Sequence, residues 1–395
     1  MRIRDFDFNL RELAGSIGDF GTLIPLSIAL IAINGLGFTP VFLMVGLFYL
    51  AAGLYFRLPI PVQPLKVVSA IAIASPEKIT LEVMSATGII FGVFLLLLAF
   101  TGLIDRIAQL FTKPIVRGIQ LGLGFILITK GINFIKAREL IIQDSGNEQL
   151  IGIVPVNIII GIAAIVLVLV LLNNRRFPAA LVIVAAGVVI GIAYGSLDNA
   201  EWNFGPTDME LFLPGLNDFT TALYLLVIPQ IPLTIGNAII GTTDTAKSLF
   251  GAGEATQRAT NRGFSISMGL VNIPVGFLAG MPMCHGAGGL AAHYRFGART
   301  GGANLMIGLV FMILALAFGM AGVSILSSIP NAVLGVLLLF AGLELAMLIG
   351  DIQNKEDLFI ACLIAGIGLA TTNMSIAFGA GIVVAYFIKR VRVEI

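Results

Sequence analysis

The stretch that decides the fold reads Pro59-Ile60-Pro61-Val62-Gln63-Pro64-Leu65-Lys66, and it lies between two apolar runs. Each proline removes an amide donor and drives the residue before it toward an extended conformation, so this stretch cannot be helix interior. A run that can form a helix begins at Pro64. The sequence therefore predicts a break followed by a helix whose N-terminus points into the protein. Such an end is a natural anion site, because it offers free amides and a positive dipole.

The composition is that of a membrane protein. Of the 395 residues, 58% are hydrophobic and 11% are charged. Apolar runs of roughly twenty residues recur from end to end, which is the pattern of transmembrane helices. The net charge of +1 gives no indication of nucleic-acid binding. The two cysteines, Cys284 and Cys362, form neither a metal motif nor a disulfide framework, and we expect no metal and no cofactor.

We therefore expect an all-α polytopic membrane protein with about fourteen membrane segments. Segments three and ten, Pro64–Ala74 and Gly286–Phe296, are short half-helices, and a polar loop at Gly195–Phe219 separates two halves of the chain. The other expected segments are Leu13–Asn34, Pro40–Leu58, Leu81–Leu103, Pro114–Gly131, Val154–Leu172, Pro178–Tyr194, Thr220–Thr242, Phe264–Met281, Asn304–Gly322, Pro330–Ile349, Leu358–Thr371 and Ser375–Ile388.

The two halves of the chain, residues 10–195 and 220–390, read as a repeat. Residues 46–64 (GLFYLAAGLYFRLPIPVQP) align without a gap onto residues 269–287 (GLVNIPVGFLAGMPMCHGA). The first break thus has a counterpart at Met281–Gly288. A repeat of seven segments, an odd number, inserts in opposite orientations, so the two breaks should face each other near the middle of the membrane. The alternative is a chance recurrence of glycine and proline spacing in a glycine-rich chain.

Basic residues predict the orientation in the cell membrane. Three arginines, the last of them Arg11, precede the first segment, and Lys389 and Arg390 follow the last. The loop at 198–218 carries acidic residues but no lysine or arginine. Because lysine and arginine concentrate in cytoplasmic loops, we expect both termini in the cytoplasm. Lys130 and its basic neighbours fall in an expected outer loop and are the exception.

Four motifs occur in order along the chain. They are Gly18-Asp19-Phe20-Gly21-Thr22, Pro61-Val62-Gln63-Pro64, Pro229–Thr234 with Asn237, and Met281–Gly286 with Gly288-Gly289. On these motifs the chain resembles the molybdate transporter family, which is related to the SulP sulfate permeases. The resemblance implies the seven-plus-seven inverted-repeat fold shared with uracil permease. It also implies a core of segments 1–4 and 8–11 that moves against a gate of segments 5–7 and 12–14.

The resemblance implies a secondary transporter that imports molybdate by alternating access, with tungstate and sulfate as related ions. The chain ends soon after its last segment, so we expect no STAS domain. A homodimer is what the fold resemblance implies, and no ATPase partner is implied. The alternative within transport is a sulfate, other oxyanion or nucleobase carrier on the same fold. A channel fits mirrored broken helices less well. No spacing resembles an enzyme's nucleophile or nucleotide site, so we expect no enzyme.

A tetrahedral dianion that leaves water needs several hydrogen-bond donors and positive potential. At the first break the candidate donors are the amides of Leu65 and Lys66 and the side chain of Gln63. Gln63 can instead cap its own helix. The ammonium group of Lys66 can neutralise part of the dianion or, alternatively, snorkel toward the membrane surface or pair with a carboxylate.

At the second break the backbone amides of Gly286, Ala287 and Gly288 are candidate donors, because an oxyanion can approach glycine closely. His285 can donate to the anion or titrate near neutral pH. The alternative for His285 is a structural histidine that caps the break. His293 is interpreted as structural. The sequence therefore predicts that the two breaks hold opposite sides of one oxyanion.

In the eighth segment Gln230, Thr234, Asn237 and Asp244 fall at helical spacing on one face. Polar residues in an apolar membrane helix should face the interior of the bundle. Gln230 and Thr234 lie nearest the middle of the membrane and are candidate contacts of the anion. For Asn237 we prefer hydrogen bonding between helices.

In the first segment Thr22 is a candidate contact and shares a face with Asp19. Asp19 is itself negative and is a poor anion ligand. It can pair with Lys66 or carry a coupling proton. We hypothesise that protonation of Asp19 or Asp244 favours entry of the dianion, which would make the protein a proton symporter. Glu344 and Asp351 receive no role.

Overall fold

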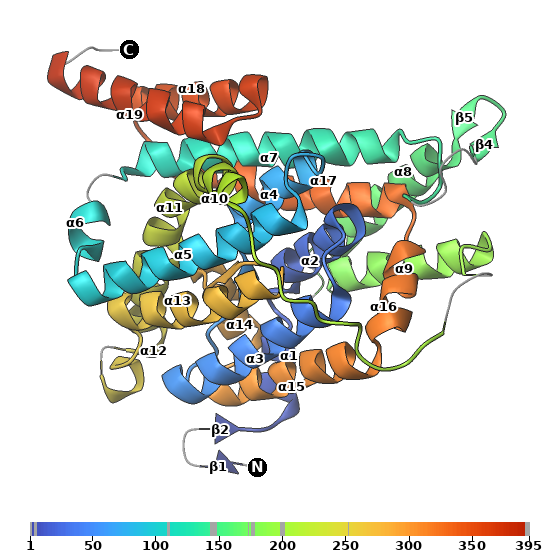
Figure 1. Ribbon diagram of the computed structural model, residues 1–395, viewed down its shortest axis with the longest axis horizontal. Helices are drawn as coiled ribbons and strands as arrows, with labels where there is room; N and C mark the ends of the chain where they lie inside the picture. The colour runs from blue at the N-terminus through green and yellow to red at the C-terminus, as the bar shows by residue number, and fades with distance from the viewer. Residues whose placement is uncertain are drawn as a thin grey trace.

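Helices account for most of the described chain. The computed structural model describes residues 2–3, 6–108, 111–142, 148–172, 174, 178–197, 202–251 and 253–391. Residues 198–201 of the acidic loop lie outside these ranges. Figure 1 shows the helices packed as one body, with the hairpin α18 (Lys355–Thr371) and α19 (Met374–Val391) against α7 (Lys113–Ile135) at its edge. The largest hydrophobic cluster draws buried residues from both halves of the chain.

The remaining elements follow the order of the sequence. The first half has α1 (Leu10–Ser16), α2 (Phe20–Asn34), α3 (Phe38–Phe56), α4 (Lys66–Ala74), α5 (Leu81–Thr101), α6 (Ile104–Ala108), α8 (Val156–Leu171) and α9 (Ala179–Ala193). The second has α10 (Leu216–Ala222), η1 (Leu223–Val227), α11 (Ile228–Leu233), η2 (Thr234–Gly241), α12 (Thr242–Phe250), η3 (Glu254–Thr256), α13 (Asn261–Phe277), α14 (Ala287–Phe296), α15 (Gly301–Ala317), α16 (Gly319–Ser327), α17 (Asn331–Met347) and η4 (Leu348–Asp351). The strand pairs are β1 (Arg2–Ile3) with β2 (Phe6–Asp7), β3 (Gln63–Pro64) with β6 (Met283–Cys284), and β4 (Leu150–Ile151) with β5 (Val154–Pro155).

Local sequence explains where several helices begin. The side chain of Asn9 accepts hydrogen bonds from the amides of Arg11 and Glu12 and caps α1. Threonine side chains cap the first turns of α5, α13 and α15 in the same way. Each cap satisfies amides that have no partner within the helix.

The first expected segment, Leu13–Asn34, is not one helix. It is broken into α1 and α2, which are bent by 52°. Gly15 and Gly18 allow this bent end to lie against the end of α14, because a Cβ on Gly18 would come within 3.0 Å of the backbone of Ala292. Asp19 therefore stands at a third helix break, just before α2.

Length and composition identify fewer spans than the sequence predicts. Within the described ranges five helices are long and apolar enough to cross a membrane, or seven if each bent pair is one span. α8, α9 and α19 are apolar but shorter. The eighth segment extends beyond its expected ends into one helical stretch of 35 residues, Leu216–Phe250. The eleventh ends at Ala317, before α16 begins. The protein is a multi-pass membrane protein with a helical fold.

Glycines let three helix pairs pack closely. α3 packs on α15 at Gly46 and Gly308, where a Cβ on Gly46 would be 2.7 Å from the carbonyl oxygen of Gly308. α5 packs on α13 at Gly92, and α7 packs on α17. Small residues are what allow helix backbones to approach in a membrane. These pairs hold the two halves of the chain together.

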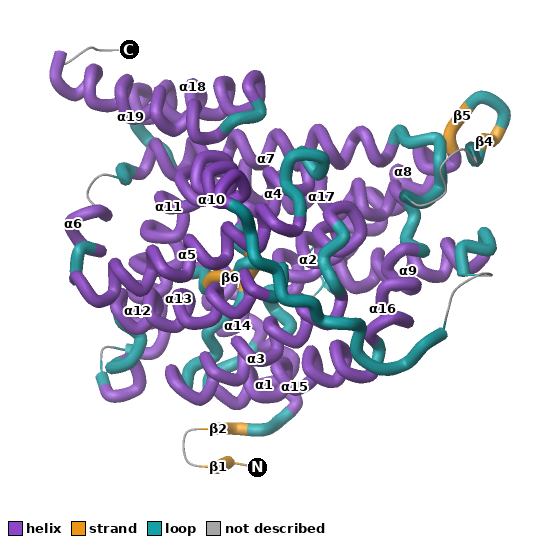
Figure 2. The backbone as a smooth tube through the Cα atoms, in the orientation of Figure 1, coloured by secondary structure: helices purple, strands orange, loops and turns teal. Residues whose placement is uncertain are grey.

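The two breaks lie side by side in the centre of the protein, as the repeat predicts. β3 and β6 pair antiparallel, with Gln63 opposite Cys284 and Pro64 opposite Met283. Figure 2 shows β6 deep among the helices near α14. Two segments more than 200 residues apart thus join where each interrupts a helix.

Candidate anion site

The irregular backbone of the first break is satisfied by side chains. Four successive carbonyl groups, those of Pro59, Ile60, Pro61 and Val62, accept hydrogen bonds from His293 Nδ1, Asn304 Nδ2, His285 Nδ1 and Tyr49 Oη at 2.9, 2.7, 2.8 and 3.3 Å, respectively. Non-helical backbone at membrane depth is tolerated when it is buried and its polar groups are paired. Three of these four donors come from the second half, so the halves must be assembled for the break to form.

His285 faces the first break and not the cavity described below. Since a carbonyl oxygen can only accept, His285 Nδ1 carries the proton that it donates to Pro61. Its Nε2 then accepts from the hydroxyl of Ser267 at 2.8 Å. The ring is completely buried and contacts the rings of Phe48 and Phe264. This arrangement supports the structural interpretation of His285, because both ring nitrogens are occupied.

Asn272 holds the second break in a similar way. Its side-chain amide accepts from the backbone N–H of Met283 and donates to the carbonyl of the same residue, at 2.8 and 2.7 Å. On the other side, the amide of Leu65 donates to the carbonyl of Pro282 at 2.9 Å. The Leu65 amide, a predicted anion donor, is therefore used between the two breaks.

Gln230 caps α4. Its side-chain oxygen accepts from the amides of Val67 and Val68 at 2.9 and 3.4 Å, and its nitrogen donates to the hydroxyl of Thr234 at 2.9 Å. Gln230 and Thr234 are both buried and do not line the cavity. The structure thus gives these two predicted contacts a role in holding the start of α4.

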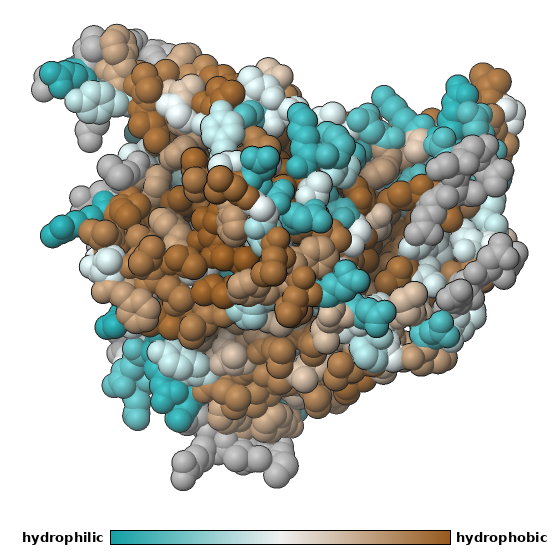
Figure 3. Space-filling view, in the orientation of Figure 1, coloured by the Kyte–Doolittle hydropathy of each residue, from teal (hydrophilic) through white to brown (hydrophobic). Residues whose placement is uncertain are grey.

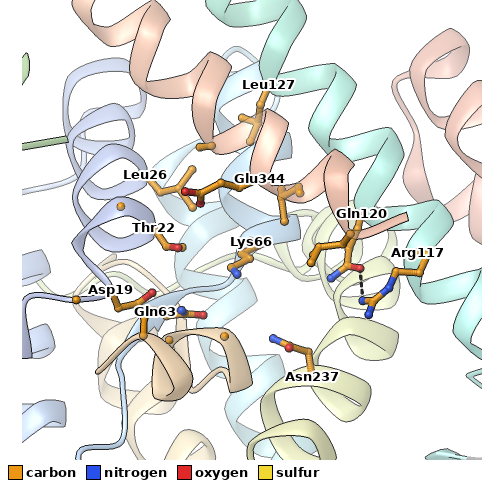
Figure 4. A pocket seen from close by; sticks show the side chains of 18 residues that line it. Asp19, Thr22, Leu26, Gln63, Lys66, Arg117, Gln120, Leu127, Asn237 and Glu344 are labelled. Carbon is orange, nitrogen blue, oxygen red and sulfur yellow. Dashed lines mark hydrogen bonds between the residues drawn. The ribbon is translucent and has the colours of Figure 1, made fainter. Parts of the chain in front are cut away.

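A cavity of about 360 Å³ lies beside the two breaks. Figure 4 shows its polar side chains, which project from α2, β3, α4, α7, η2 and α17 and from the bend before α2. The lining residues are Gly18, Asp19, Gly21, Thr22, Leu26, Gln63, Lys66, Arg117, Gln120, Leu127, Asn237, Gly288, Gly289, Ala292, Ala341, Glu344, Leu345 and Leu348. Of the predicted site residues, Thr22, Gln63, Lys66, Gly288, Asp19 and Asn237 therefore meet in one space.

Asp19 and Gln63 form a pair against the start of α14. Gln63 Nε2 donates to Asp19 Oδ2 at 2.7 Å, and both side chains are buried. A Cβ on Gly289 would lie 2.6 Å from each of these two atoms, and one on Gly286 would meet the side-chain oxygen of Gln63. Among the described residues no side chain caps the first turn of α14, and the space beside Gly288 is open. The N-terminus of α14 thus lies at the cavity, which Gly288 and Gly289 line.

Charges of both signs face the cavity. Lys66 projects toward its centre (Figure 4), where its ammonium group interacts electrostatically with Asp19 and Glu344. Among the described residues Lys66 forms no direct ion pair with either carboxylate. The predicted pairing of Lys66 with Asp19 is therefore a longer-range interaction in this structure.

The mouth of the cavity holds residues that the sequence analysis did not assign to the site. Arg117 donates to both carboxylate oxygens of Asp351, at 3.0 and 2.7 Å, and to Gln120 at 2.8 Å. Lys113 lies 3.2 Å from the same carboxylate. Arg117 and Gln120 are three residues apart and so share a face of α7, which is a helical signal that could have grouped them.

The expected polar face of the eighth segment is interrupted. η2 has π-helical geometry, so its residues turn more slowly around the axis than in an α-helix and the stripe changes direction. Asn237 projects into the cavity (Figure 4), whereas Asp244, on α12, is exposed and lies outside the lining. The described residues contain no cluster of three or more His, Cys, Asp or Glu side chains that could hold a metal.

Helices that break in pairs beside a polar cavity, inside a bundle of apolar helices, define a membrane transporter. The chain belongs to the molybdate transporter family. A family model described as "Molybdate transporter of MFS superfamily" matches residues 11–127 and 222–345, which include the polar residues of the cavity. The family is one of transporters and not of enzymes.

Curated relatives support this membership along the whole chain. Molybdate transporter 2 of Arabidopsis thaliana is 31% identical, in an alignment that covers 96% of this chain and 87% of that protein. Molybdate transporter 1 of Chlamydomonas reinhardtii is 27% identical, in an alignment that covers 94% of this chain and 90% of that protein. Both alignments therefore include the two breaks.

Solved structures show the fold. The transmembrane domain of a cyanobacterial bicarbonate transporter, BicA, superposes with a TM-score of 0.69 at 14% identity, covering 96% of this chain and 98% of that one. Murine Solute Carrier 26 family member A9, an anion transporter solved in an inward-facing state, superposes with a TM-score of 0.69 at 17% identity. This superposition covers 100% of this chain and 70% of that one. The fold is thus of the type found in Solute Carrier 26 transporters.

Proposed function

We propose that this protein imports molybdate across the cell membrane by alternating access. The observation that carries the proposal is the cavity itself, where the open N-terminus of α14 and the ammonium group of Lys66 face one space. A helix N-terminus contributes about half a positive charge together with unpaired amides. These are the features that a desolvated dianion requires, and molybdate is the ion that the family membership indicates.

We place the anion between α14 and Lys66. The amides of Gly288 and Gly289 donate from one side, and Thr22 and Asn237 donate from the walls. Gln63 is held by Asp19 and positions the first turn of α14. His285, Gln230 and Thr234 belong to the scaffold that keeps the two breaks together.

We further propose the full arrangement of fourteen segments in a seven-plus-seven inverted repeat. The packing of the helices supports it. The repeat relates α3 to α13 and α5 to α15, so the contact of α3 with α15 corresponds to the contact of α5 with α13. The pair α7 and α17 maps onto itself under the same exchange. The core then contains the breaks, and the gate contains α7 and α17. Both termini are cytoplasmic, and two chains form a dimer.

In this orientation the cavity opens inward. The residues that line the cavity extend from the two breaks to Arg117 and Leu348. Arg117 and Leu348 lie at the same end of the helix bundle as Lys113. Basic residues of that end belong in the cytoplasm. The structure then corresponds to the state that releases the anion into the cell.

Import is coupled to protons through carboxylates of the cavity. Asp19 and Glu344 both face the space of Lys66, so a dianion entering there meets two like charges. Protonation of either carboxylate removes one of these two negative charges, which favours binding of the dianion in the cavity. Asp244 is exposed and does not line the cavity, so the proposal gives it no part in coupling. With Glu344→Gln we expect molybdate exchange to persist, and with Asp19→Asn we expect exchange at a raised apparent KM because Gln63 loses its charged acceptor, while stimulation by an inward proton gradient is lost from one variant. Stimulation that survives in the double variant would end the coupling proposal.

The deciding experiment is uptake of molybdate by the purified protein in liposomes across an imposed pH gradient. Tungstate should compete far better than sulfate or uracil. Lys66→Met should raise the apparent KM for molybdate strongly. Stronger competition by sulfate or uracil would instead identify an oxyanion or nucleobase carrier on the same fold.

A further inference from the structure

Two cavities adjoin each other on the outside of the core, away from the anion site. The first is an apolar groove of about 400 Å³ between α3 and α13, lined by Leu47, Phe48, Ala51, Ala52, Tyr55 and residues of α13 from Gly263 to Pro274. The second, of about 430 Å³, lies at the end of α3 beside the loops that follow α12 and α14. We call them the groove and the arginine pocket.

The arginine pocket carries an excess of positive charge. Arg57, Arg258 and Arg299 line it together with a single acidic residue, Glu254. Arg57 and Arg258 are exposed, and the guanidinium group of Arg299 stacks 3.6 Å from the ring of Tyr294. Arg299 Nη1 donates to the carbonyls of Tyr294 and Ala298, which fixes the guanidinium group and leaves its other nitrogen atoms to donate to an anion.

Arg258 connects the two cavities. It donates to the carbonyl of Tyr55 at 2.9 Å and lies 5.6 Å from the centre of the Tyr55 ring, which lines the groove. A cation therefore stands at the point where the apolar groove ends. Figure 3 shows the corresponding change of surface, from apolar side chains over α5 and α13 to hydrophilic ones over the loop after α12.

We propose that this joined site binds an anionic phospholipid. Its phosphate lies among the three arginines, and one acyl chain lies in the groove between Leu47, Tyr55 and Leu270. These three side chains are 40%, 48% and 60% exposed, and in a membrane that surface faces hydrocarbon. Basic pockets beside membrane helices favour anionic head groups. The proposal rests on the membrane arrangement given above but not on which ion is transported.

The bound lipid stabilises both breaks. Arg57 immediately precedes the first break, and Arg299 lies in the turn between α14 and α15. In the groove, Ser267 donates to His285, which holds the carbonyl of Pro61. A lipid that fills both cavities therefore packs against elements that position the two halves of the anion site.

Native mass spectrometry of the purified protein with mixed phosphatidylethanolamine and phosphatidylglycerol tests the proposal. Wild-type protein should retain phosphatidylglycerol preferentially. Arg258→Ala should reduce that retention about fivefold, the change expected for one arginine at an anionic surface. The matched control is Arg262→Ala, an exposed arginine outside both cavities. Equal retention of both lipids, or equal loss in the two variants, would overturn the proposal.

A second pair of variants tests the acyl chain without changing charge. Leu270→Trp fills the groove and should lower phosphatidylglycerol retention, whereas Leu309→Trp changes a similarly exposed leucine of α15 outside it. Displacement of the lipid by inorganic phosphate alone would show that the pocket takes a soluble anion and would overturn the lipid assignment. These measurements need no molybdate. They can therefore refute lipid binding while molybdate transport stands, and the uptake experiments can refute molybdate transport while lipid binding stands.

Discussion

Replacing Gly289 with alanine should separate Gln63 from Asp19 and weaken molybdate import. The added Cβ would lie 2.6 Å from an atom of each side chain, whereas ordinary contacts begin at 3.4 Å. Both atoms must therefore move by about 0.8 Å away from the added methyl group, which strains or breaks their 2.7 Å hydrogen bond. A hydrogen bond to a charged group contributes about 1.5–3 kcal/mol. The apparent affinity should accordingly fall by roughly ten- to a hundredfold.

The assay is the initial rate of molybdate uptake into liposomes as a function of concentration, with equal amounts of protein that remains monodisperse in detergent. Gly366→Ala is the matched control, because it makes the same change inside α18 where an added Cβ meets nothing within 4 Å. We expect the control to keep the wild-type KM. An unchanged KM and maximal rate in Gly289→Ala would refute the placement of the anion beside the Asp19–Gln63 pair.

Three further predictions concern the scaffold and the mouth of the cavity. Gln230→Leu leaves two buried amides of α4 without their acceptor, and each loss should destabilise the protein by about 1–3 kcal/mol. The midpoint of thermal unfolding in detergent should therefore fall clearly, and an unaltered midpoint would contradict the capping role. Asn272→Ala removes both hydrogen bonds to Met283 and should lower the midpoint and abolish uptake, and full activity would show that the second break holds without this clamp. Asp351→Asn weakens a partly exposed ion pair with Arg117, so stability should change by about 1 kcal/mol or less, measured by the same denaturation, and a large loss would refute that estimate.

Both breaks and their meeting could be predicted because the signals are local and repeated. The closely spaced prolines at residues 59–64 cannot lie inside a helix. The gapless alignment of residues 46–64 with 269–287 then relates the first break to the second. The meeting of the two breaks follows from that relation, whereas the register that pairs Gln63 with Cys284 comes from the structure. The cavity residues Thr22, Lys66 and Gly288 were also found from their motifs, since each lies at or beside a break.

Other features depended on packing and had no local signal. His285 stands at a break and looks available from the sequence, but the carbonyl of Pro61 and the hydroxyl of Ser267 use both of its ring nitrogens. The π-helical η2 changes which residues of the eighth segment share a face, and Asp244 does not line the cavity. Glu344 entered it because α17 packs beside α2 and α7.

The sequence by itself therefore determined that this chain is a helical membrane protein, that two helices break, and that the breaks correspond. These properties depend on composition, on the missing amide of proline and on a repeat, all of which act within short stretches. The tertiary structure decided which polar groups satisfy the broken backbone and which are left to face the cavity. Most buried donors and acceptors must find a partner, and the partners available to residues 59–68 come mostly from helices far away in the chain.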